Sequence, residues 1–339
     1  MATKWGICSA GKISNDFVVA LRTLDAEEHQ VAAVAARSLE SAQAFAATHK
    51  IESAYGSYDE LAMSEKVDII YIGSINSQHL SLCKLFLNHG KPVLCEKPLG
   101  LNADEVKEIT DLAKEKNLFM MEGVWSRFFP VYAKVREVIS SGRIGDIKCV
   151  MVSFGYPLIT NERLAKKDLG GGALLDLGIY TVQLALMVFG GQMPLSVASK
   201  GFLTENGVDE TSSTTLLFPD NGIAVLTCTG TCTLPNEADI VGTKGRMRIF
   251  FPFWCPTHLQ ILDEKGTENK SFILPKPSQQ LNFDNGTGMR FEAQAVRDCL
   301  QQGLKEHSLV THEDSFKFAT ILDQARHSLG YFHDKELAK

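Results

Sequence analysis

The stretch Lys4-Trp-Gly-Ile-Cys-Ser-Ala-Gly-Lys-Ile-Ser14 decides the fold of the N-terminal part of the chain. It reads as a short apolar strand that ends near Cys8, a turn of small residues, and the start of a helix. A dinucleotide-binding fold places its phosphate turn here, with the fingerprint G-x-G-x-x-G. Only the middle glycine, Gly11, is present, and Ser9 and Ser14 take the other two places. Taken alone, the stretch fits an ordinary strand-turn-helix unit equally well.

The residues after the second strand indicate which cofactor is bound. Strand 30–35 is followed by Ala36-Arg37-Ser38, whereas enzymes that bind NAD usually carry Asp or Glu at this place. Arg37 can clamp a 2′-phosphate with a charge-assisted hydrogen bond, and Ser38 adds a hydroxyl. A solvated arginine at a strand end is the plain alternative. We predict NADP rather than NAD, with the pyrophosphate on the turn formed by Ser9, Ala10, Gly11, Lys12 and Ile13.

Further strands continue the pattern. Strand 67–72 is followed by helix 78–88, and strands near 90–98 and at 118–121 come next. Such alternation predicts a doubly wound parallel sheet with ligands at the carboxyl ends of its strands. We therefore assign residues 1–124 to an NADP-binding Rossmann domain. The other candidate cofactor ligands are Tyr71, Ser74, Asn76, His79, Glu96, Lys97, Trp125 and Arg127. For His79, a partly exposed surface histidine is the plain alternative.

The pattern changes beyond residue 124. Strand-like runs follow one another through short turns such as Pro219-Asp-Asn-Gly222, which predicts a large open, mostly antiparallel sheet. The runs span 147–154, 195–203, 211–218, 223–233, 239–242, 246–251, 258–262 and 270–274. Helices are expected at 134–141, 287–302 and 313–331. We assign residues 125–339 to a substrate-binding and dimerisation domain of the α+β class.

Segment 173–189 is apolar almost throughout and reads as a helix buried on all sides. Asp176, Tyr180 and Gln183 are its polar exceptions, spaced so that they share one face. A buried carboxylate is costly without a partner, so this face must meet partners, water or a ligand. The glycines at 170–172 offer backbone N–H groups that can closely approach a ligand. The plain alternative is a glycine loop, a capped helix and a core tyrosine.

Composition narrows the classes of function. With 339 residues, of which 45% are hydrophobic, the chain can fill the cores of two domains. A net charge of −6 argues against a nucleic-acid-binding surface. The eight cysteines lack zinc-ligand spacing, so we expect no metal. The apolar runs read as too short to span a membrane, and a strand begins within a few residues of the N-terminus, so we expect a soluble, cytoplasmic protein.

Several motifs together resemble one family. Five motifs occur together in this chain: the Gly11 turn, Asn76-Ser-Gln-His79, Cys95-Glu-Lys-Pro98, Glu122-Gly-Val-Trp-Ser-Arg-Phe128 and Gly170-Gly-Gly-Ala-Leu-Leu-Asp-Leu-Gly-Ile-Tyr180. Together they resemble the glucose–fructose oxidoreductase/inositol dehydrogenase (Gfo/Idh/MocA) family over essentially the whole chain. Two positions depart from the usual pattern. Ser9 replaces the first glycine, and Ile75 stands where many members have proline.

Within the family, the chain looks closest to members that oxidise trans-dihydrodiols of aromatic hydrocarbons. This resemblance rests on the glycine triplet, on Tyr180 in place of the commoner histidine, and on Asn282-Phe-Asp-Asn285. It implies NADP-dependent oxidation of such cyclic diols, or of aldoses such as D-xylose, and a homodimer through the open face of the C-terminal sheet. Two alternatives remain: a catalytically silent nucleotide-binding sensor or scaffold, and a nicotinamide-dependent glycosidase. The presence of both Lys97 and Tyr180 speaks against the silent protein.

The expected chemistry is hydride transfer with Tyr180 as acid/base. A phenol has a pKa of about 10, and lowering it by roughly three units requires about 4 kcal/mol. One ammonium at about 4 Å supplies a comparable amount at an effective dielectric constant of about 20. We therefore expect Lys97 to activate Tyr180 in a pocket between the domains, with Asp176 orienting Lys97 or binding the substrate. The candidate substrate contacts are Trp125, Phe154, Asp176, Tyr180, Trp254 and Phe283, with Phe128 and Tyr156 as further walls, although most aromatic residues are simply core.

Overall fold

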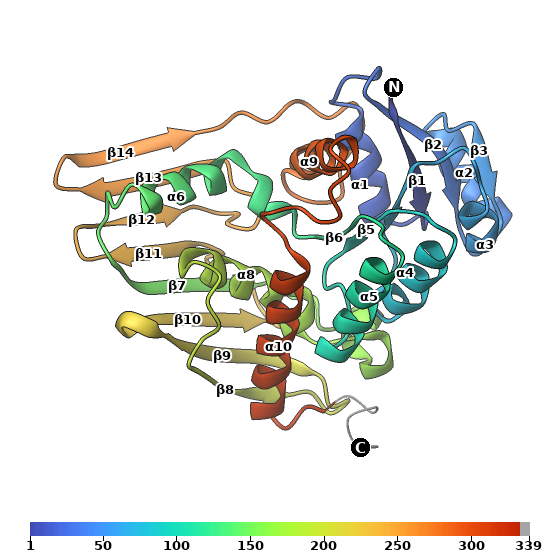
Figure 1. Ribbon diagram of the computed structural model, residues 1–339. Coiled ribbons are helices and arrows are strands. Elements are labelled where there is room, and N and C mark those ends of the chain that lie inside the picture. Colours follow the sequence, from blue (N-terminus) through green and yellow to red (C-terminus); the bar gives the residue numbers. More distant parts are fainter. Residues whose placement is uncertain (333–339) are drawn as a thin grey trace. The chain divides into compact units, whose positions relative to one another are not determined.

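The computed structural model describes residues 1–332, which form two compact units (Figure 1). The first unit contains Met1–Gly100, Asp104–Phe128 and Leu274–Ser315; the second contains Leu101–Ala103, Phe129–Ile273 and the chain from Phe316.

The first unit is built on sheet A, in which all strands are parallel. Its strands lie in the order β3-β2-β1-β4-β5-β6, the arrangement of a Rossmann fold. Their bounds are β1 (Thr3–Cys8), β2 (His29–Ala35), β3 (Ser53–Tyr55), β4 (Ile69–Ile72), β5 (Val93–Glu96) and β6 (Met120–Gly123). The predicted doubly wound parallel sheet is confirmed. Sequence reasoning missed β3, because three residues are too few to show a periodic pattern.

Helices follow these strands, and α4 matches the expected helix 78–88 closely. They are α1 (Lys12–Leu21), α2 (Leu39–Thr48), α3 (Tyr58–Ala62), α4 (His79–Asn88) and α5 (Ala103–Glu115). Short 3₁₀ turns, η1 (Asn76–Gln78) and η2 (Trp125–Phe128), follow β4 and β6. The edge of sheet A at the carboxyl ends of its strands therefore gathers the turns that carry most of the candidate cofactor ligands.

A segment far along the sequence completes the first unit. Turn η6 (Gly286–Gly288) and helix α9 (Met289–Gln301) pack against α1 (Figure 1). The predicted boundary at residues 124/125 placed this segment in the second domain, and the structure differs from it there. The amphipathic pattern of α9 shows that one face is buried but does not show which surface covers it.

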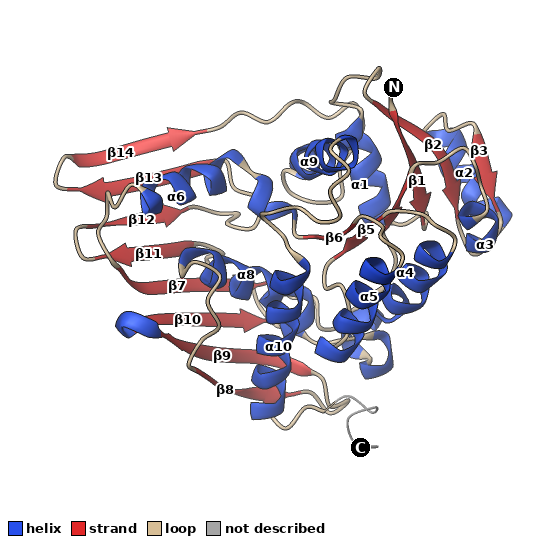
Figure 2. Cartoon of the chain, in the orientation of Figure 1, coloured by secondary structure: helices blue, strands red, loops and turns tan. Residues whose placement is uncertain are grey.

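The second unit is built on sheet B, with the strand order β14-β13-β12-β11-β7-β10-β9-β8 (Figure 2). Among the strands that the structure describes in this sheet, β7 and β10 are parallel and the other neighbours are antiparallel. The bounds are β7 (Ile147–Gly155), β8 (Ser196–Leu203), β9 (Asp209–Phe218), β10 (Gly222–Thr229), β11 (Ala238–Gly242), β12 (Gly245–Ile249), β13 (His258–Asp263) and β14 (Gly266–Ser271). The predicted large, mostly antiparallel sheet is confirmed. The final strand lies a few residues earlier than the predicted 270–274.

Helices cover one face of sheet B. Helix α8 (Ile179–Val188) packs over β7 and β10, where inward residues such as Ala224 and Leu226 are buried. The remaining helical segments among the described residues are α6 (Pro130–Ser140), α7 (Glu162–Ala165), η3 (Lys167–Leu169), η4 (Leu174–Gly178), η5 (Pro219–Asn221) and α10 (His312–Ser328). On the strands themselves, Met151 and Leu217 keep 45% and 44% of their surface exposed. Sheet B therefore has one covered face and one face with exposed apolar side chains.

The stretch Lys167–Val188 is long and apolar enough to cross a membrane by length and composition. The expectation that every apolar run is too short is therefore wrong. However, 94% of its most apolar window is buried in the structure, as in the core helix of a globular unit.

Candidate functional site

The turn after β1 has the geometry of a phosphate-binding turn. Ser9 adopts a φ of +89°, a left-handed conformation that favours glycine, which is the usual residue at this place. Gly11 is the N-cap of α1, and no side chain among residues 1–332 caps this helix. A Cβ added to Gly11 would meet only the Gly73 carbonyl oxygen and Ser9 Oγ, each at 3.6 Å, which are ordinary contacts. The fold itself does not require glycine here, and the N–H groups of the first turn, which starts at Lys12 and Ile13, are open to an anion.

Arg37 lies just beyond the carboxyl end of β2. Its side chain is exposed and makes no hydrogen bond or ion pair within the described part of the chain. Ser38 makes a contact that the sequence analysis did not predict. As the N-cap of α2, its Oγ accepts the Ser41 N–H at 3.2 Å and donates to Ser41 Oγ at 2.9 Å. Sequence reasoning missed Tyr58. Burial raises the pKa of this phenol, and the charge of the nearby Arg37 offsets part of the rise.

Glu96 and Lys97 lie at the carboxyl end of β5. Tyr71 Oη donates to Glu96 Oε1 at 2.8 Å, and the Lys97 backbone N–H donates to Glu96 Oε2 at 3.2 Å. Tyr71 is fully buried and stacks on Phe17, with ring centroids 3.7 Å apart. Burial and the neighbouring Glu96 raise the pKa of Tyr71 well above its usual range. Tyr71 is therefore a neutral donor that orients Glu96 from the core.

His79 joins the loops that follow β4 and β5. Its Nδ1 lies 2.8 Å from the Pro98 carbonyl oxygen, and its Nε2 lies 3.2 Å from that of Ser74. The side chain is fully buried, so the alternative of a partly exposed surface histidine is wrong. Asn76 is buried at the start of η1, and Ser74 Oγ donates to the Ile75 carbonyl at 3.3 Å. His79 thus ties together two loops of the cofactor edge.

Arg127 anchors the segment that returns to the first unit. Its Nη1 donates to the Leu309 carbonyl at 2.8 Å and lies 3.4 Å from Asp314 Oδ2. Trp125, two residues earlier in η2, is also buried. These two contacts join Arg127 to the later segment of the chain that contains Leu309 and Asp314.

Two buried acids of the first unit were missed as candidate site residues. Glu122 on β6 accepts the Leu99 N–H at 2.9 Å, and burial raises its pKa to about 7. Glu292 on α9 is fully buried, and neither of its carboxyl oxygens has a hydrogen-bond partner among residues 1–332. Burial, with a contribution from Glu96, raises its pKa well above the usual range. Both groups hold a proton more strongly than an exposed glutamate does.

In the second unit, Asp176 lies in a π-turn, η4 (Leu174–Gly178), that runs directly into α8. Such widened turns are frequent at functional sites. Arg163 on α7 forms a bidentate ion pair with Asp176, with Nη1–Oδ1 at 2.8 Å and Nη2–Oδ2 at 3.1 Å. Sequence reasoning expected this carboxylate to face partners, water or a ligand but did not identify Arg163, because a single arginine outside any motif carries no pattern.

Tyr180 lies beside an aromatic wall. Phe154 meets the Tyr180 ring edge-on at 5.7 Å between centroids and stacks on Trp254 at 4.3 Å. Tyr156 packs edge-on against both wall residues. Gln183, the third polar residue of the helix, donates from Nε2 to Tyr132 Oη at 3.1 Å. The structure thus brings Tyr180, Phe154 and Trp254 together.

Phe283 belongs to the first unit and keeps 45% of its surface exposed. Trp125, another predicted substrate contact, lies in the same unit. The predicted substrate contacts are therefore divided between the units: Trp125 and Phe283 belong to the first, and Phe154, Asp176, Tyr180 and Trp254 belong to the second. Lys97, the predicted partner of Tyr180 in catalysis, belongs to the first unit.

The glycine triplet does not offer free N–H groups to a ligand, so that prediction is wrong. The N–H groups of residues 170–172 donate to carbonyls of residues 164–167. Gly172 has a φ of +108°, and an added Cβ would lie 2.2 Å from Asp209 Oδ1. The Asp209 carboxylate accepts the Leu174 N–H at 2.6 Å, and burial raises its pKa to about 6. Gly172 therefore leaves room for Asp209 to cap the start of the helical segment that carries Asp176 and Tyr180.

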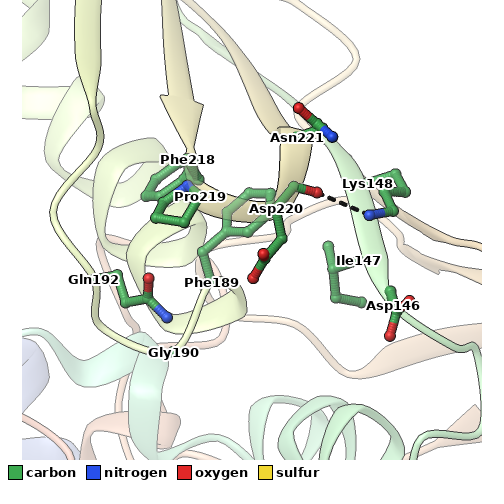
Figure 3. A pocket seen from close by; sticks show the side chains of 10 residues that line it. All are labelled: Asp146, Ile147, Lys148, Phe189, Gly190, Gln192, Phe218, Pro219, Asp220 and Asn221. Carbon is green, nitrogen blue, oxygen red and sulfur yellow. Dashed lines mark hydrogen bonds between the residues drawn. The ribbon is translucent and has the colours of Figure 1, made fainter.

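A separate hollow of about 570 Å³ lies at the other end of α8 (Figure 3). It is formed where β7 begins, where α8 ends and where β9 turns into β10. Lys148 Nζ donates to the Asp220 carbonyl across it at 2.8 Å. Its lining contains no predicted site residue.

Two parts of the chain match protein-family models, and the whole chain is similar to known dehydrogenases. Residues 3–124 match the "Oxidoreductase family, NAD-binding Rossmann fold", and residues 132–248 match the "GFO/IDH/MocA C-terminal domain". The chain is 50% identical over 330 residues to the trans-1,2-dihydrobenzene-1,2-diol dehydrogenase of Xenopus tropicalis, covering 97% of this chain and 99% of that one. It is 45% identical over 330 residues to the human protein of the same name, covering 97% and 98%.

Solved structures share the fold at lower identity. Levoglucosan dehydrogenase, in complex with NADH and levoglucosan, gives a TM-score of 0.84 at 19% identity, covering 97% of this chain and 98% of that one. KijD10, a 3-ketoreductase from Actinomadura kijaniata in complex with NADP and TDP-benzene, gives 0.81 at 23% identity, covering 97% and 98%.

Proposed function

Because the chain belongs to the Gfo/Idh/MocA family of oxidoreductases, we propose that it oxidises trans-dihydrodiols of aromatic hydrocarbons towards catechols, with NADP as the cofactor. Aldoses such as D-xylose are further proposed substrates. The observation that carries this proposal is the setting of Tyr180, a phenol beside a π-turn and against the wall of Phe154 and Trp254. Full-length relatives named dihydrodiol dehydrogenase support the choice of substrate.

The first unit suits a phosphorylated dinucleotide. The uncapped start of α1 would hold the pyrophosphate, and Gly11 has room there for a ligand. Arg37, which is exposed and makes no hydrogen bond or ion pair within residues 1–332, would pair with the 2′-phosphate. Tyr58, partly buried and close enough to Arg37 to feel its charge, would border this site.

The reaction divides into a hydride and a proton. When bound, NADP supplies the hydride acceptor. Tyr180 takes the hydroxyl proton as the substrate carbon is oxidised to a carbonyl, and it therefore works best as a phenolate. We assign Lys97 the role of favouring that phenolate through its positive charge. Asp176, held in place by Arg163, would accept a hydrogen bond from the second hydroxyl of the diol.

The aromatic wall suits a flat, unsaturated ring. Phe154 and Trp254 offer ring faces and edges against which a dihydrodiol can stack. Sugars also stack on aromatic side chains, which is why aldoses remain within the proposal.

A homodimer through the exposed face of sheet B is also part of the proposal. Met151 and Leu217 supply apolar surface on its strands, which a second copy would cover. Sedimentation analysis would give twice the mass of the chain if this is right, and the mass of one chain if it is wrong.

The test of the proposed function is the formation of reduced nicotinamide, followed by absorbance. The purified chain is mixed with trans-1,2-dihydrobenzene-1,2-diol or D-xylose, and with NADP or NAD. The proposal predicts turnover of the diol, faster with NADP at subsaturating cofactor. Binding of NADP without any net reduction on a panel of diols and pentoses would favour the sensor or the glycosidase.

A further inference from the structure

The peptide groups on both sides of Leu174, the first residue of the π-turn η4, are held by hydrogen bonds. The Leu174 N–H donates to Asp209 Oδ2 at 2.6 Å, and the Leu174 carbonyl accepts the N–H of Ile179. In a regular α-helix the carbonyl of Leu175 would accept that N–H, so the bond from Ile179 to Leu174 is the one that widens the turn. The widened turn therefore begins at the residue that Asp209 binds.

The widened turn decides how the polar side chains around it point. It holds one residue more than an α-helical turn, which corresponds to about 100° of rotation about the helix axis. Asp176 lies inside the turn, and Tyr180 comes directly after Ile179. If the turn closed to a regular one, side chains before and after it would rotate relative to each other by about that angle. The direction of the Tyr180 ring thus depends on this turn.

The carboxylate that holds Leu174 comes from sheet B and not from the chain before the helix. An ordinary N-cap is the residue that precedes the helix, whereas Asp209 lies 35 residues further along, at the start of β9. Strand β9 pairs with β10, and β10 pairs with β7, which carries Phe154 (Figure 2). The hydrogen bond therefore ties the start of the helical segment to the sheet that supplies the aromatic neighbour of Tyr180.

The surroundings of Asp209 favour a charged acceptor. Asp209 is fully buried, and Gly172 leaves the space that its carboxylate occupies, since an added Cβ would lie 2.2 Å from Oδ1. Burial raises the pKa of Asp209 to about 6, and the Leu174 N–H and the positive charge of the buried Arg326 on α10 oppose that rise. The carboxylate is therefore ionised in weakly alkaline solution, and an ionised acceptor makes a stronger hydrogen bond than a neutral one.

We propose that Asp209 is a positioning residue for Tyr180: by holding the Leu174 N–H from sheet B, it fixes where the widened turn begins and so aims the Tyr180 hydroxyl. Asp209 contacts neither substrate nor cofactor in this scheme. Asp209, Leu174, Phe154 and Tyr180 all belong to the second unit. The inference rests on the proposed function, because it takes Tyr180 as the acid/base.

The first test measures kcat and KM for oxidation of trans-1,2-dihydrobenzene-1,2-diol by NADP in weakly alkaline solution. Asp209→Ala removes the acceptor, and kcat should fall about 100-fold because a misdirected reacting group is costly. KM for NADP should stay within about twofold, since the phosphate turn lies in the first unit. Asp209→Asn keeps an oxygen that can accept the Leu174 N–H, and its kcat should stay within about tenfold of wild type.

A double-mutant cycle with Tyr180→Phe asks whether Asp209 acts through Tyr180. In the Tyr180→Phe background, Asp209→Ala should lower the remaining kcat by no more than about threefold. Asp263→Ala is the matched control. Asp263 also accepts a backbone N–H within this unit, from Lys265 at 2.8 Å, and it forms an ion pair with Arg143. Its replacement should lower thermal stability without lowering kcat.

Crystal structures of wild type and Asp209→Ala test the geometry without any substrate. In the variant, the Ile179 N–H should bind a carbonyl other than that of Leu174, and the Tyr180 ring should leave its edge-on contact with Phe154. Asp209→Asn is the milder change and carries the test if the alanine variant does not fold. Amide hydrogen exchange of Leu174 should accelerate at least tenfold in Asp209→Asn, while exchange in β13 stays unchanged.

Three results would overturn the inference. The first is an Asp209→Ala structure that keeps the bond from Ile179 to Leu174 and the Tyr180 ring in place. The second is unchanged exchange of the Leu174 amide in Asp209→Asn. The third is an equal loss of kcat from Asp209→Ala with and without the Tyr180 hydroxyl.

Failure of the proposed function would look different. In that case the wild-type chain reduces no NADP with any diol, and the kinetic tests cannot be read. The crystal structures and the exchange of the Leu174 amide then still decide whether Asp209 fixes the widened turn.

Discussion

Arg163 and Asp176 form a bidentate ion pair, Nη1–Oδ1 at 2.8 Å and Nη2–Oδ2 at 3.1 Å, at the π-turn that leads into the helix of Tyr180. Asp176 is 7% exposed, so its charge is largely withdrawn from water and depends on the guanidinium. The ion pair thus fixes a carboxylate one turn before the proposed acid/base. It also explains how a charged residue persists in an otherwise apolar helix.

Replacing Arg163 should damage both activity and stability. Arg163→Met leaves the Asp176 carboxylate uncompensated, and we expect a loss of roughly 3 kcal/mol in the free energy of unfolding. We also expect kcat/KM for the diol to fall by roughly 10- to 100-fold, about 1.4 to 2.7 kcal/mol of transition-state stabilisation. Urea unfolding and steady-state kinetics measure the two effects.

Arg248→Met is the matched control for this variant. Arg248 pairs with Asp239 in the same bidentate manner, at 2.9 and 3.0 Å, on adjacent strands and with both side chains partly exposed. Exposed pairs contribute only about 0–1 kcal/mol, so the control should lose little stability and no activity. Equal losses in the two variants would contradict a special role for Arg163.

Replacing Arg37 should change cofactor preference. In Arg37→Ala the 2′-phosphate loses a charged hydrogen bond worth roughly 1.5–3 kcal/mol, which corresponds to about 10- to 150-fold in affinity. KM for NADP should rise by that factor, and KM for NAD should change little. Kinetics with both cofactors at a saturating concentration of the diol provide the measurement. An equal rise for NADP and NAD would remove Arg37 from the 2′-phosphate site.

Glu122 should make stability fall as pH rises. Its native pKa of about 7 lies above the unfolded value of about 4.5, so the native state binds the proton more tightly in this interval. The contribution of Glu122 to the free energy of unfolding is fully present below the pKa of the unfolded state. It is lost as pH rises through the pKa of the native state. Glu122→Gln cannot titrate at this position. Between pH 5.5 and pH 8, its free energy of unfolding should therefore rise by roughly 2 kcal/mol relative to that of wild type.

Urea unfolding of both proteins at the two pH values measures this difference. Glu115→Gln, at an exposed glutamate on α5, is the control and should show no such trend. If the free energies of unfolding of wild type and Glu122→Gln differ by the same amount at both pH values, the raised pKa of Glu122 is contradicted.

Gly172→Ala should cost more than an alanine at another glycine with positive φ. The added Cβ would lie 2.2 Å from Asp209 Oδ1 and disturb the cap of the helical segment that carries Asp176 and Tyr180. We expect a loss of roughly 3–5 kcal/mol from strain, overpacking and the lost cap, with reduced kcat. Gly190, with a φ of +68° and open space around it, is the comparison, and Gly190→Ala should cost only about 1–2 kcal/mol. Similar thermal stability of the two variants would show that Asp209 can move aside.

Local patterns predicted most of the fold. Apolar runs such as those of β4 and β5 are bounded by turns, and the switch to closely spaced strands after residue 124 is visible in the sequence. The short strand β3 was missed because three residues carry no period. The π-turn at Asp176 was missed because a widened turn and an ordinary helical turn have the same apolar composition.

Partners distant in sequence could not be predicted. Asp16 meets Asn282, Asp209 meets Leu174, and Arg127 meets Leu309, and each pairing depends on the folded arrangement. For the same reason α9 could be predicted as a helix but not as part of the first unit. Ser38 adds a contact that sequence reasoning did not predict, since its hydroxyl caps the helix that follows the strand.

The most direct test of the central claim compares wild type with Tyr180→Phe in the oxidation of trans-1,2-dihydrobenzene-1,2-diol by NADP. Removing the phenolic hydroxyl leaves the ring against Phe154 and removes only the proton acceptor. The account predicts that kcat falls by roughly 10²–10⁴. NADP affinity, measured by fluorescence titration, should stay near that of wild type. Turnover by Tyr180→Phe at the wild-type rate would contradict the account and transfer the role of acid/base to another residue.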